Sequence, residues 1–272
     1  LSALRVFVET RLDLFGPYED AIDESNWTMS HSMLSVPMNL GLLDPVEVVS
    51  AAEEAYMSGM ARLSSVEGFI RQIIGWRDFV WHLYWHFGAQ YLEMNELGAE
   101  RPLPTSWREL DGAKTSARCV SNTLEVVQKQ AWHHHIPRLM ILGNIALQQG
   151  YNPKSVNDWF IDNFADGYKW VMPANTIGMS LHADGGLMST KPYAGGGSYI
   201  SKMSNHCKAC PFDPKARTGD KACPVTNGYW QFLDKHQERF SKNHRMLQAL
   251  SGLKRLSDRE SLSNIDFDSY GF

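Results

Sequence analysis

Apolar residues recur at steps of three and four along most of this chain, which is the period of an α-helix that buries one face. The longest such stretch runs from Val66 to Phe87, where charged residues are interleaved with the apolar ones. Residues 1–14 and 45–62 show the same period, and we expect the first of these helices to stop at Gly16–Pro17. Hardly any stretch alternates in steps of two, so the sequence predicts a mostly α-helical fold.

The second half of the chain contains two more helical patterns and a glycine-rich stretch. One pattern runs from about Lys114 to Gln149, and Pro137 inside it predicts a kink near His133–His135. The other starts at Asn152–Pro153, a capping residue followed by a proline at the first helical position. Residues 182–199 form a loop whose glycines permit close approach to a ligand. The loop contains neither GxGxxG nor GxxxxGKS/T, so an ordinary dinucleotide or P-loop site is unsupported.

Composition describes an ordinary globular chain of 272 residues, 43% of them hydrophobic and 21% charged. This length allows one large domain or two. The formal net charge of −4 means that a nucleic-acid partner would need a local basic surface. No apolar run reaches the roughly 18 to 20 residues of a membrane span. Because the chain starts without methionine and already in a helical pattern, we expect it to be a piece of a longer protein.

Cysteine spacing is the strongest chemical signal in the sequence. Cys207 and Cys210 form a Cys-x-x-Cys pair, Cys223 follows in the same loop, and Cys119 stands alone far upstream. Four thiolates can hold a structural zinc ion or an iron–sulfur cluster, and the spacing does not choose between them. A redox pair, a disulfide or unconnected buried thiols would explain the same residues. We favour a metal centre because three cysteines crowd into one loop, and metal-bound thiolates fit a reducing, cytoplasmic compartment.

Two short segments carry groups that suit a polar ligand or a proton transfer. The hydroxyl-rich turn His31–Ser35 could hold a phosphate beside a helix start, although a capping turn is the better interpretation from the residues alone. The adjacent histidines His133 to His135 cannot all face one way on a helix, so at most one or two can enter a site. Acid–base chemistry near neutral pH suits such a histidine, while a surface or capping role fits equally well.

Five segments of the chain form a specific combination: SVEGFIRQIIGWRDF (65–79), HHHIPRLMILGN (133–144), DGYKWVMPANTIGM (166–179), ADGGLMSTKPYAGGGSYI (183–200) and the cysteine loop (206–224). In this order they resemble the photolyase/cryptochrome superfamily, and most closely its bacterial iron–sulfur branch of prokaryotic (6-4) photolyases and related cryptochromes. The resemblance implies an all-helical FAD-binding catalytic domain over residues 1–256, with residues 257–272 as a C-terminal tail. The N-terminal α/β domain that carries an antenna chromophore in complete members would lie outside this chain.

The resemblance also implies which residues hold the cofactors. It identifies the metal centre as a [4Fe–4S] cluster with Cys119, Cys207, Cys210 and Cys223 as ligands. It assigns the turn 31–35 to the FAD phosphates, which replaces the capping interpretation. Arg138 and Asp166 would form a pair beside the isoalloxazine ring. The full set assigned to FAD is Ser32, Leu34, Ser35, Glu67, Arg71, Gln72, Arg138, Asp166 and Asn175.

Four residues are implied in catalysis: His135 as proton donor, the neighbouring His134, Tyr193 on the substrate side, and Trp159 next to the flavin in photoreduction. The chain also departs from its relatives. Phe160 and Asp111 stand where relatives often carry oxidisable aromatic residues, so we expect electrons to use another route, through Tyr168, Trp170 or Trp230. Met172 stands where a polar residue is common near the flavin, and Leu139 stands where eukaryotic (6-4) enzymes carry a second histidine.

The function implied by the resemblance is light-driven, FAD-dependent repair of UV-damaged DNA, most specifically of (6-4) photoproducts, by a monomeric enzyme. A cryptochrome-type photoreceptor without repair activity is the alternative. A third hypothesis is a nucleic-acid protein without flavin, in which the cluster is structural, as in the distantly similar primase large subunit. The WRDF and KPYAGGG stretches weigh against this third hypothesis.

Overall fold

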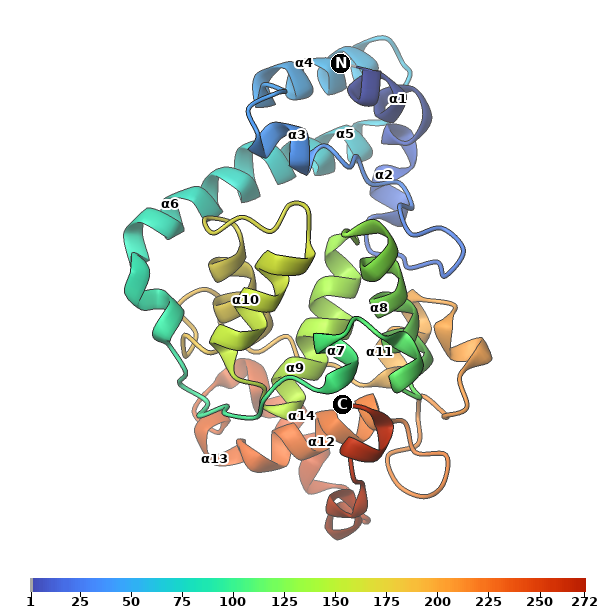
Figure 1. The fold of residues 1–272 in the computed structure, drawn as a ribbon, viewed down its shortest axis with the longest axis vertical. Helices are drawn as coiled ribbons and strands as arrows, with labels where there is room; N and C mark the ends of the chain where they lie inside the picture. The colour runs from blue at the N-terminus through green and yellow to red at the C-terminus, as the bar shows by residue number, and fades with distance from the viewer. Residues whose placement is uncertain (1) are drawn as a thin grey trace.

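The computed structural model describes residues 2–272, which form helices joined by loops (Figure 1). β-structure within these residues is limited to isolated bridges, such as the one between Ile22 and Ser204. The predicted mostly α-helical fold is therefore confirmed. None of the described helices is both long enough and apolar enough to cross a membrane. The α-helices of the first half are α1 (Ser2–Thr10), α2 (Leu12–Tyr18), α3 (Ser35–Asn39), α4 (Pro45–Met57), α5 (Leu63–Ile70), α6 (Asp78–Phe87), α7 (Thr105–Arg108) and α8 (Arg118–Gln130). Those of the second half are α9 (Asn144–Gln149), α10 (Pro153–Asn163), α11 (Gly197–Met203), α12 (Pro224–Lys235), α13 (Gln237–Phe240) and α14 (Leu247–Lys254).

Helices α1 to α5 pack together as a lobe at one end of the molecule, drawn at the top of Figure 1. The lobe has its own apolar core, separate from the larger core of the body. Aromatic rings join its helices, because the Phe69 ring of α5 lies 4.7 Å from that of Phe7 and 5.7 Å from that of Phe15. The remaining helices form the body, so a boundary between two packed units runs across the molecule.

Helix α2 shows that the expected stop at Gly16–Pro17 is wrong, since both residues lie inside the helix. A proline has no N–H for the carbonyl four residues earlier, which here is that of Asp13. The hydroxyl of Ser65 on α5 donates to this carbonyl at 2.7 Å and accepts from the Gly16 N–H at 3.0 Å. A neighbouring helix thus satisfies the carbonyl that the proline leaves free, and α2 continues to Tyr18.

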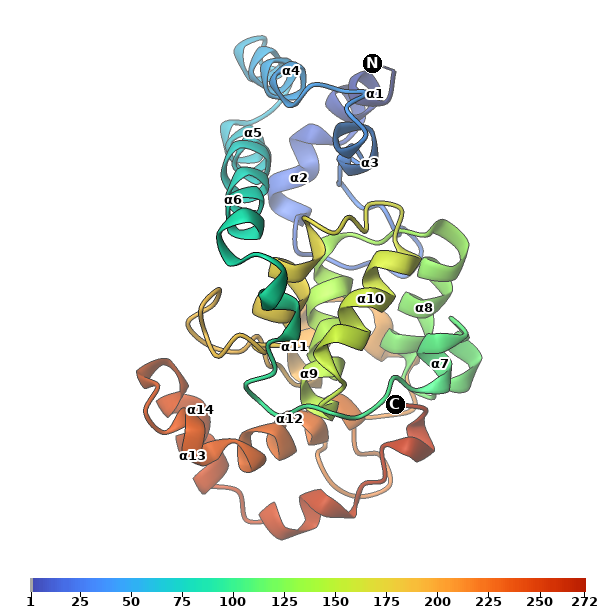
Figure 2. The same cartoon turned by 60° about the vertical axis from the view of Figure 1, so that its left-hand side comes forward.

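The long helix predicted from Val66 to Phe87 is confirmed. Helices α5 and α6 are joined without interruption by a π-helical segment, Arg71–Arg77. The resulting rod leaves the N-terminal lobe and descends along the side of the body (Figure 2). The rod therefore borders both the N-terminal lobe and the body.

The helix predicted from Lys114 to Gln149 is broken rather than kinked. Helix α8 ends at Gln130, where Ala131 adopts a left-handed conformation with φ of 48°. A new helical run begins near Pro137 as a π-helical segment, Pro137–Gly143, and continues as α9. His133 and His134 therefore lie in a non-helical link. This link determines the directions in which the side chains of the three histidines point.

Two helix starts are confirmed by their caps. The Asp44 carboxylate accepts from the Val46 N–H at 2.8 Å before α4, and the Asn152 side chain accepts from the Ser155 N–H at 3.0 Å before α10. Helix α4 ends at Met57, earlier than the pattern to residue 62 indicates. Both starts carry a proline at the first turn, where a missing N–H costs nothing.

Residues 257–272 lie against the body. Leu262 and Phe272 are buried, and the Ser106 hydroxyl donates to the Gly271 carbonyl at 2.7 Å. Arg101 pairs with Asp268 at 2.7 Å. These contacts connect the end of the chain to the region around α7.

Candidate functional site

A cavity of about 680 Å³ lies where the N-terminal lobe, the long helix and the body meet. Pockets for cofactors and small ligands typically enclose about 300 to 1,000 Å³. The lobe contributes Phe15 and Ser35, the long helix contributes Gln72 and Trp76, and the body contributes much of the remainder. The cavity is thus a site for a sizeable ligand at the boundary between two units.

A buried ion pair lies on the body side of this cavity. The Arg138 guanidinium holds the Asp166 carboxylate with two contacts, of 2.8 and 3.1 Å, and the Ser35 hydroxyl donates to the same carboxylate at 2.8 Å. The guanidinium also lies 4.3 Å from the Phe164 ring centroid. Burial alone would raise the pKa of Asp166, but Arg138 and Ser35 outweigh burial and hold the pKa below its usual value. The pair therefore stays ionised and joins the lobe to the body.

A row of side chains connects Asp20 to His135 and His31. The Asp20 carboxylate lies 3.3 Å from Nε2 of His135, and Nδ1 of His135 lies 3.3 Å from Nε2 of His31. Burial, and then the charge of His135, lowers the pKa of His31 to about 3. The hydrogen bond to His135 lowers the pKa of Asp20. His135 lies between the Asp20 carboxylate and the buried His31 ring, and 49% of its side chain is accessible.

All three adjacent histidines line the cavity, so the expectation that at most one or two could enter a site is wrong. That expectation assumed a helix, whereas the link after α8 is non-helical at His133 and His134. His133 and His134 are both 1% exposed. Nitrogens of His31, His134 and His135 lie within 4.8 Å of one another, a spacing that would suit a metal ion. The His31 and His134 rings are stacked at 4.4 Å, however, so their lone pairs run side by side rather than converging.

The four cysteines meet around a second, smaller cavity in the body. Cys119 comes from the first turn of α8, Cys223 precedes α12, and Cys207 and Cys210 lie in the loop after α11. Gly197 fits closely against this site, since a Cβ there would lie 2.8 Å from the Cys223 sulfur. Burial, and then the other three thiols, raise the pKa of Cys119 well above its usual range. A cation would relieve that repulsion, so four thiols in an apolar cavity fit a metal centre.

Comparison with known proteins identifies relatives of this arrangement. No protein-family model matches the chain. A (6-4) photolyase from Agrobacterium fabrum (strain C58 / ATCC 33970) is 44% identical over 256 residues, which cover 94% of this chain and 50% of the relative. An uncharacterized protein of Acanthamoeba polyphaga mimivirus is 48% identical over 54 residues, or 20% of this chain and 44% of that protein. The crystal structure of a bacterial class III photolyase from Agrobacterium tumefaciens aligns with a TM-score of 0.56 at 16% identity, over 71% of this chain and 38% of that one.

Over nearly its whole length the chain is similar to a member of the photolyase/cryptochrome superfamily. Its similarity to the (6-4) photolyase supports the iron–sulfur bacterial branch that the sequence motifs indicated. The class III photolyase shares the fold of the aligned part. The chain spans about half the length of the (6-4) photolyase that it matches.

Most residues that the resemblance assigned to FAD line the large cavity. Its lining includes Ser32, Ser35, Gln72, Arg138, Asp166 and Asn175. The other three lie elsewhere among the described residues. Leu34 is fully buried in the core of the lobe, and Glu67 and Arg71 pair with each other on the exposed side of the long helix. Tyr193, assigned to the substrate side, lines the cavity and is 39% exposed.

Trp159 is buried behind the cavity wall, and the neighbouring Phe160 is the one that lines the cavity. The Trp159 ring lies 4.8 Å from Trp107, whose ring lies 5.8 Å from Tyr151. Trp159 also donates to the Trp107 carbonyl at 2.9 Å. Trp159, Trp107 and Tyr151 thus form a row of oxidisable aromatic rings.

The aromatic residues that the sequence proposed for electron transfer lie in other places. Trp170 is at the cavity, where its ring lies 5.4 Å from Trp81 and 5.0 Å from the Arg77 guanidinium. Trp230 packs against Tyr229 on α12. Trp107 was missed because nothing in its local sequence indicates that it packs against α10.

Asp20 was also missed. It belongs to a polar stretch, 20–26, that has no recognisable motif. Only the fold brings its carboxylate to His135, which is distant in the chain. The sequence signal that could have indicated it is weak: a run of polar residues between two helices that is too short to be a linker.

Proposed function

We propose that this chain is the FAD-dependent catalytic part of a DNA (6-4) photolyase, a lyase that uses light to repair (6-4) photoproducts. The observation that carries the proposal is the convergence of His135, Tyr193 and the Arg138–Asp166 pair on one cavity of about 680 Å³. The proposal is supported by the 44% identity to a (6-4) photolyase. UV-damaged DNA is then the substrate.

The residues around the cavity fit a large polar cofactor such as FAD. Among the described residues, several buried polar atoms that face this region have no hydrogen-bond partner, including Nε1 of Trp132, Nε of Arg77 and both ring nitrogens of His134. Buried polar groups in native proteins nearly always have partners, which a bound ligand would supply. The Arg138–Asp166 pair would lie along the flavin ring, and Ser32 and Asn175 would contact its polar edges. When bound, FAD supplies light absorption and the reversible donation of one electron.

The groups around His135 suit it to protonate a lesion. A protonated His135 would donate from Nε2 to the Asp20 carboxylate and from Nδ1 to the neutral His31 ring. An imidazole is the side chain suited to proton transfer near neutral pH, and Asp20 and His31 contact both nitrogens of this one. His135 is also the accessible histidine of the three. A substrate can therefore reach His135 while Asp20 and His31 fix the orientation of its ring.

Recognition of the lesion would depend on extrusion of the damaged bases into the cavity. Damaged bases stack poorly, so their extrusion costs less than that of intact bases. Tyr193 at the rim and the Trp76 side chain in the wall offer aromatic faces for an extruded base. The net charge of −4 makes any DNA affinity depend on local arginine and lysine contacts, and therefore on salt.

We propose that the cysteine site holds a [4Fe–4S] cluster. Four thiols and an apolar wall suit either iron–sulfur or zinc. The similarity to an iron–sulfur branch of the superfamily favours the cluster. Cys119 would then attach the start of α8 to the segment between α11 and α12, which carries the other three cysteines. Broad visible absorbance and iron in the purified protein would support the cluster, and zinc in place of iron would exclude it.

A repair assay tests the proposed activity directly. The flavin-loaded protein, with its flavin reduced, is illuminated with DNA that contains one (6-4) photoproduct. We expect restoration of the intact bases in the light and none in the dark. Light-dependent flavin chemistry without any restored DNA would instead support the photoreceptor alternative.

A further inference from the structure

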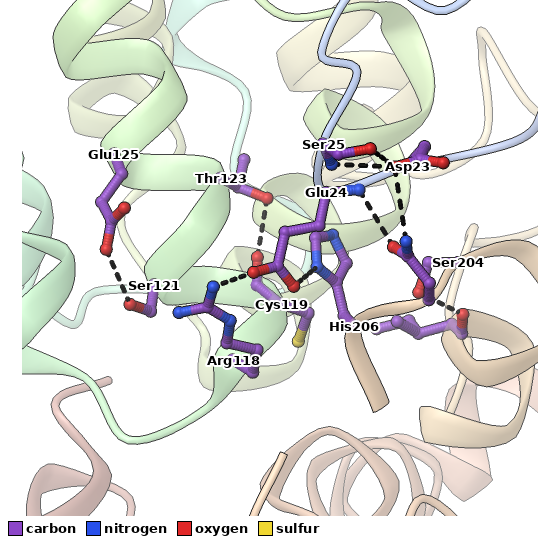
Figure 3. Close-up of polar contacts among 12 residues, drawn as sticks. Asp23, Glu24, Ser25, Arg118, Cys119, Ser121, Thr123, Glu125, Ser204 and His206 are labelled. Carbon is purple, nitrogen blue, oxygen red and sulfur yellow. Dashed lines mark hydrogen bonds and ion pairs between the residues drawn. The ribbon is translucent and has the colours of Figure 1, made fainter. Parts of the chain in front are cut away.

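A short segment between α2 and α3 connects the large cavity with the cysteine site. Near its start, the Asp20 carboxylate contacts His135. The segment is then fastened along the end of α11, because the Ile22 N–H donates to the Met203 carbonyl at 2.8 Å. The Glu24 N–H donates to the Asn205 side chain at 2.9 Å. These contacts place Glu24 beside the cysteine loop (Figure 3).

The Glu24 carboxylate bridges two residues that each precede a cysteine. One oxygen pairs with the Arg118 guanidinium, and the other lies 3.5 Å from Nδ1 of His206. Arg118 directly precedes Cys119, and His206 directly precedes Cys207. Figure 3 shows the carboxylate between the two side chains, with Cys119 close by. A single side chain therefore holds two segments that are far apart in sequence and that both supply thiols.

The side chains that Glu24 contacts are partly or fully removed from water. The His206 side chain is 0% exposed, and that of Glu24 is 25% exposed. His206 also lines the cysteine cavity. Charges that are partly removed from water are screened less than exposed ones, and loss of one partner leaves the others unsatisfied.

We infer that Glu24 is a positioning residue for the metal centre, which holds Cys119 and Cys207 in place through Arg118 and His206. The inference rests on the [4Fe–4S] cluster proposed above. Outer groups that orient metal ligands commonly change metal affinity about 10- to 100-fold when they are removed. Glu24 would act in this way without touching the cluster.

The first experiment measures how fast the cluster is lost. The full holoprotein and its Glu24→Gln variant are exposed to an iron chelator, and the visible absorbance of the cluster is followed over time. We expect the variant to lose its cluster about tenfold faster or more. Glu125→Gln is the matched control, because Glu125 lies on α8 and its carboxylate contacts Ser121 and Lys129 instead. Equal rates for Glu24→Gln and the parent would overturn the inference.

The second experiment separates positioning from general stability. Removal of the Glu24 charge should raise the reduction potential of the cluster, and Arg118→Gln should lower it, because the two charges have opposite signs. The double variant should lose its cluster no faster than the worse single variant, since both act through one bridge. A lower melting temperature with an unchanged potential and unchanged cluster loss would mean a structural role only and would overturn the inference.

Glu24→Asp covers the case in which Glu24→Gln does not fold. The shorter side chain keeps the charge, so cluster loss should be slower than in Glu24→Ala. Equal loss from these two variants would also count against the inference. A parent protein without iron would overturn the cluster proposal itself, whereas an iron-loaded parent with an unaffected Glu24 variant would overturn only the role of Glu24.

Discussion

The large cavity and the cysteine site differ in where their residues come from and in what surrounds them. The cavity takes side chains from the N-terminal lobe, the long helix and the body, and its lining mixes charged, polar and aromatic groups with apolar ones. The cysteine site lies within the body, and its wall is mostly apolar. The first suits a large ligand, whereas the second suits a small centre kept from water.

The two sites are nevertheless connected through the protein. Helix α8 starts at the cysteine site with Cys119 and ends just before the histidines of the cavity. The segment from Asp20 to Glu24 links the same two sites on another path, because Asp20 contacts His135 and Glu24 contacts Arg118. A substitution at one site can therefore be tested for its effect on the other site. The result shows how independent the two sites are.

The largest effect is expected from Cys119→Ala. It removes the thiol that comes from α8, so the broad absorbance of the cluster should disappear and the melting temperature should fall. Ser121→Ala, on the same helix, should change neither. If the two sites are independent, flavin binding should survive in the Cys119 variant. Full iron content together with an unchanged melting temperature in this variant would refute the assignment of Cys119 as a ligand.

Arg138→Ala is the corresponding change in the cavity. It leaves the Asp166 carboxylate, 9% exposed, without its cation, and loss of one partner of a buried pair costs roughly 3 to 5 kcal/mol. We expect the variant to purify without FAD while it keeps its iron. Arg138→Lys should be intermediate, because lysine cannot make the two-pronged contact. Normal flavin content in the alanine variant would argue against the role of this pair.

His135→Ala should lower the repair rate without loss of either cofactor. The repair rate of (6-4) photoproducts under fixed light should fall at least about 100-fold, as is typical of a lost general acid. Flavin content, iron content and binding of damaged DNA should remain. His82→Ala on α6 is a suitable control, because His82 is exposed, whereas His133 is buried in the cavity wall. Repair at the parent rate would exclude His135 as the proton donor.

The sequence predicts the cysteine site better than the cavity for a physical reason. Three cysteines are close in sequence, and a thiol has few uses in a reducing compartment, so spacing alone indicates a metal centre. Even Cys119, which is distant in sequence, is indicated by the number of ligands that such a centre needs. The prediction of the cysteine site therefore depends mostly on residue type and on spacing in the sequence.

The cavity depends on contacts that no local pattern encodes. The histidine link was predicted as helix because Pro137 alone cannot show that α8 ends at a left-handed Ala131. Pro17 was predicted to end a helix because the compensating hydroxyl of Ser65 belongs to another helix. Asp20 reaches His135 only through tertiary packing. Family resemblance supplied most cavity residues, and the geometry separates those at the cavity from Glu67 and Arg71, which pair outside it.

The last prediction concerns acid stability, in which the cavity should again differ from the cysteine site. Burial lowers the pKa of His31 and of His133 to about 3, and it also lowers the pKa of His134. Between pH 6.5 and about 3 the unfolded chain binds protons on these rings and the folded chain does not. The free energy of unfolding should therefore fall as the pH drops through this window, with each ring adding up to about 1.4 kcal/mol per pH unit.

His31→Asn isolates one of these protons. The His31 ring faces His134, His135, Arg138 and Asp20. Asp166 does not change this slope. Its pKa is lowered in the folded protein, so its contribution to the free energy of unfolding is lost only below pH 3.8, the usual pKa of an aspartate. Urea unfolding at several pH values from 4.5 to 6.5 should give a shallower slope for the variant than for the parent, by about one proton. His82→Asn, an exposed control, should leave the slope unchanged. Parallel slopes for His31→Asn and the parent would show that His31 is protonated in the folded protein, and the neutral partner proposed for His135 would be lost with it.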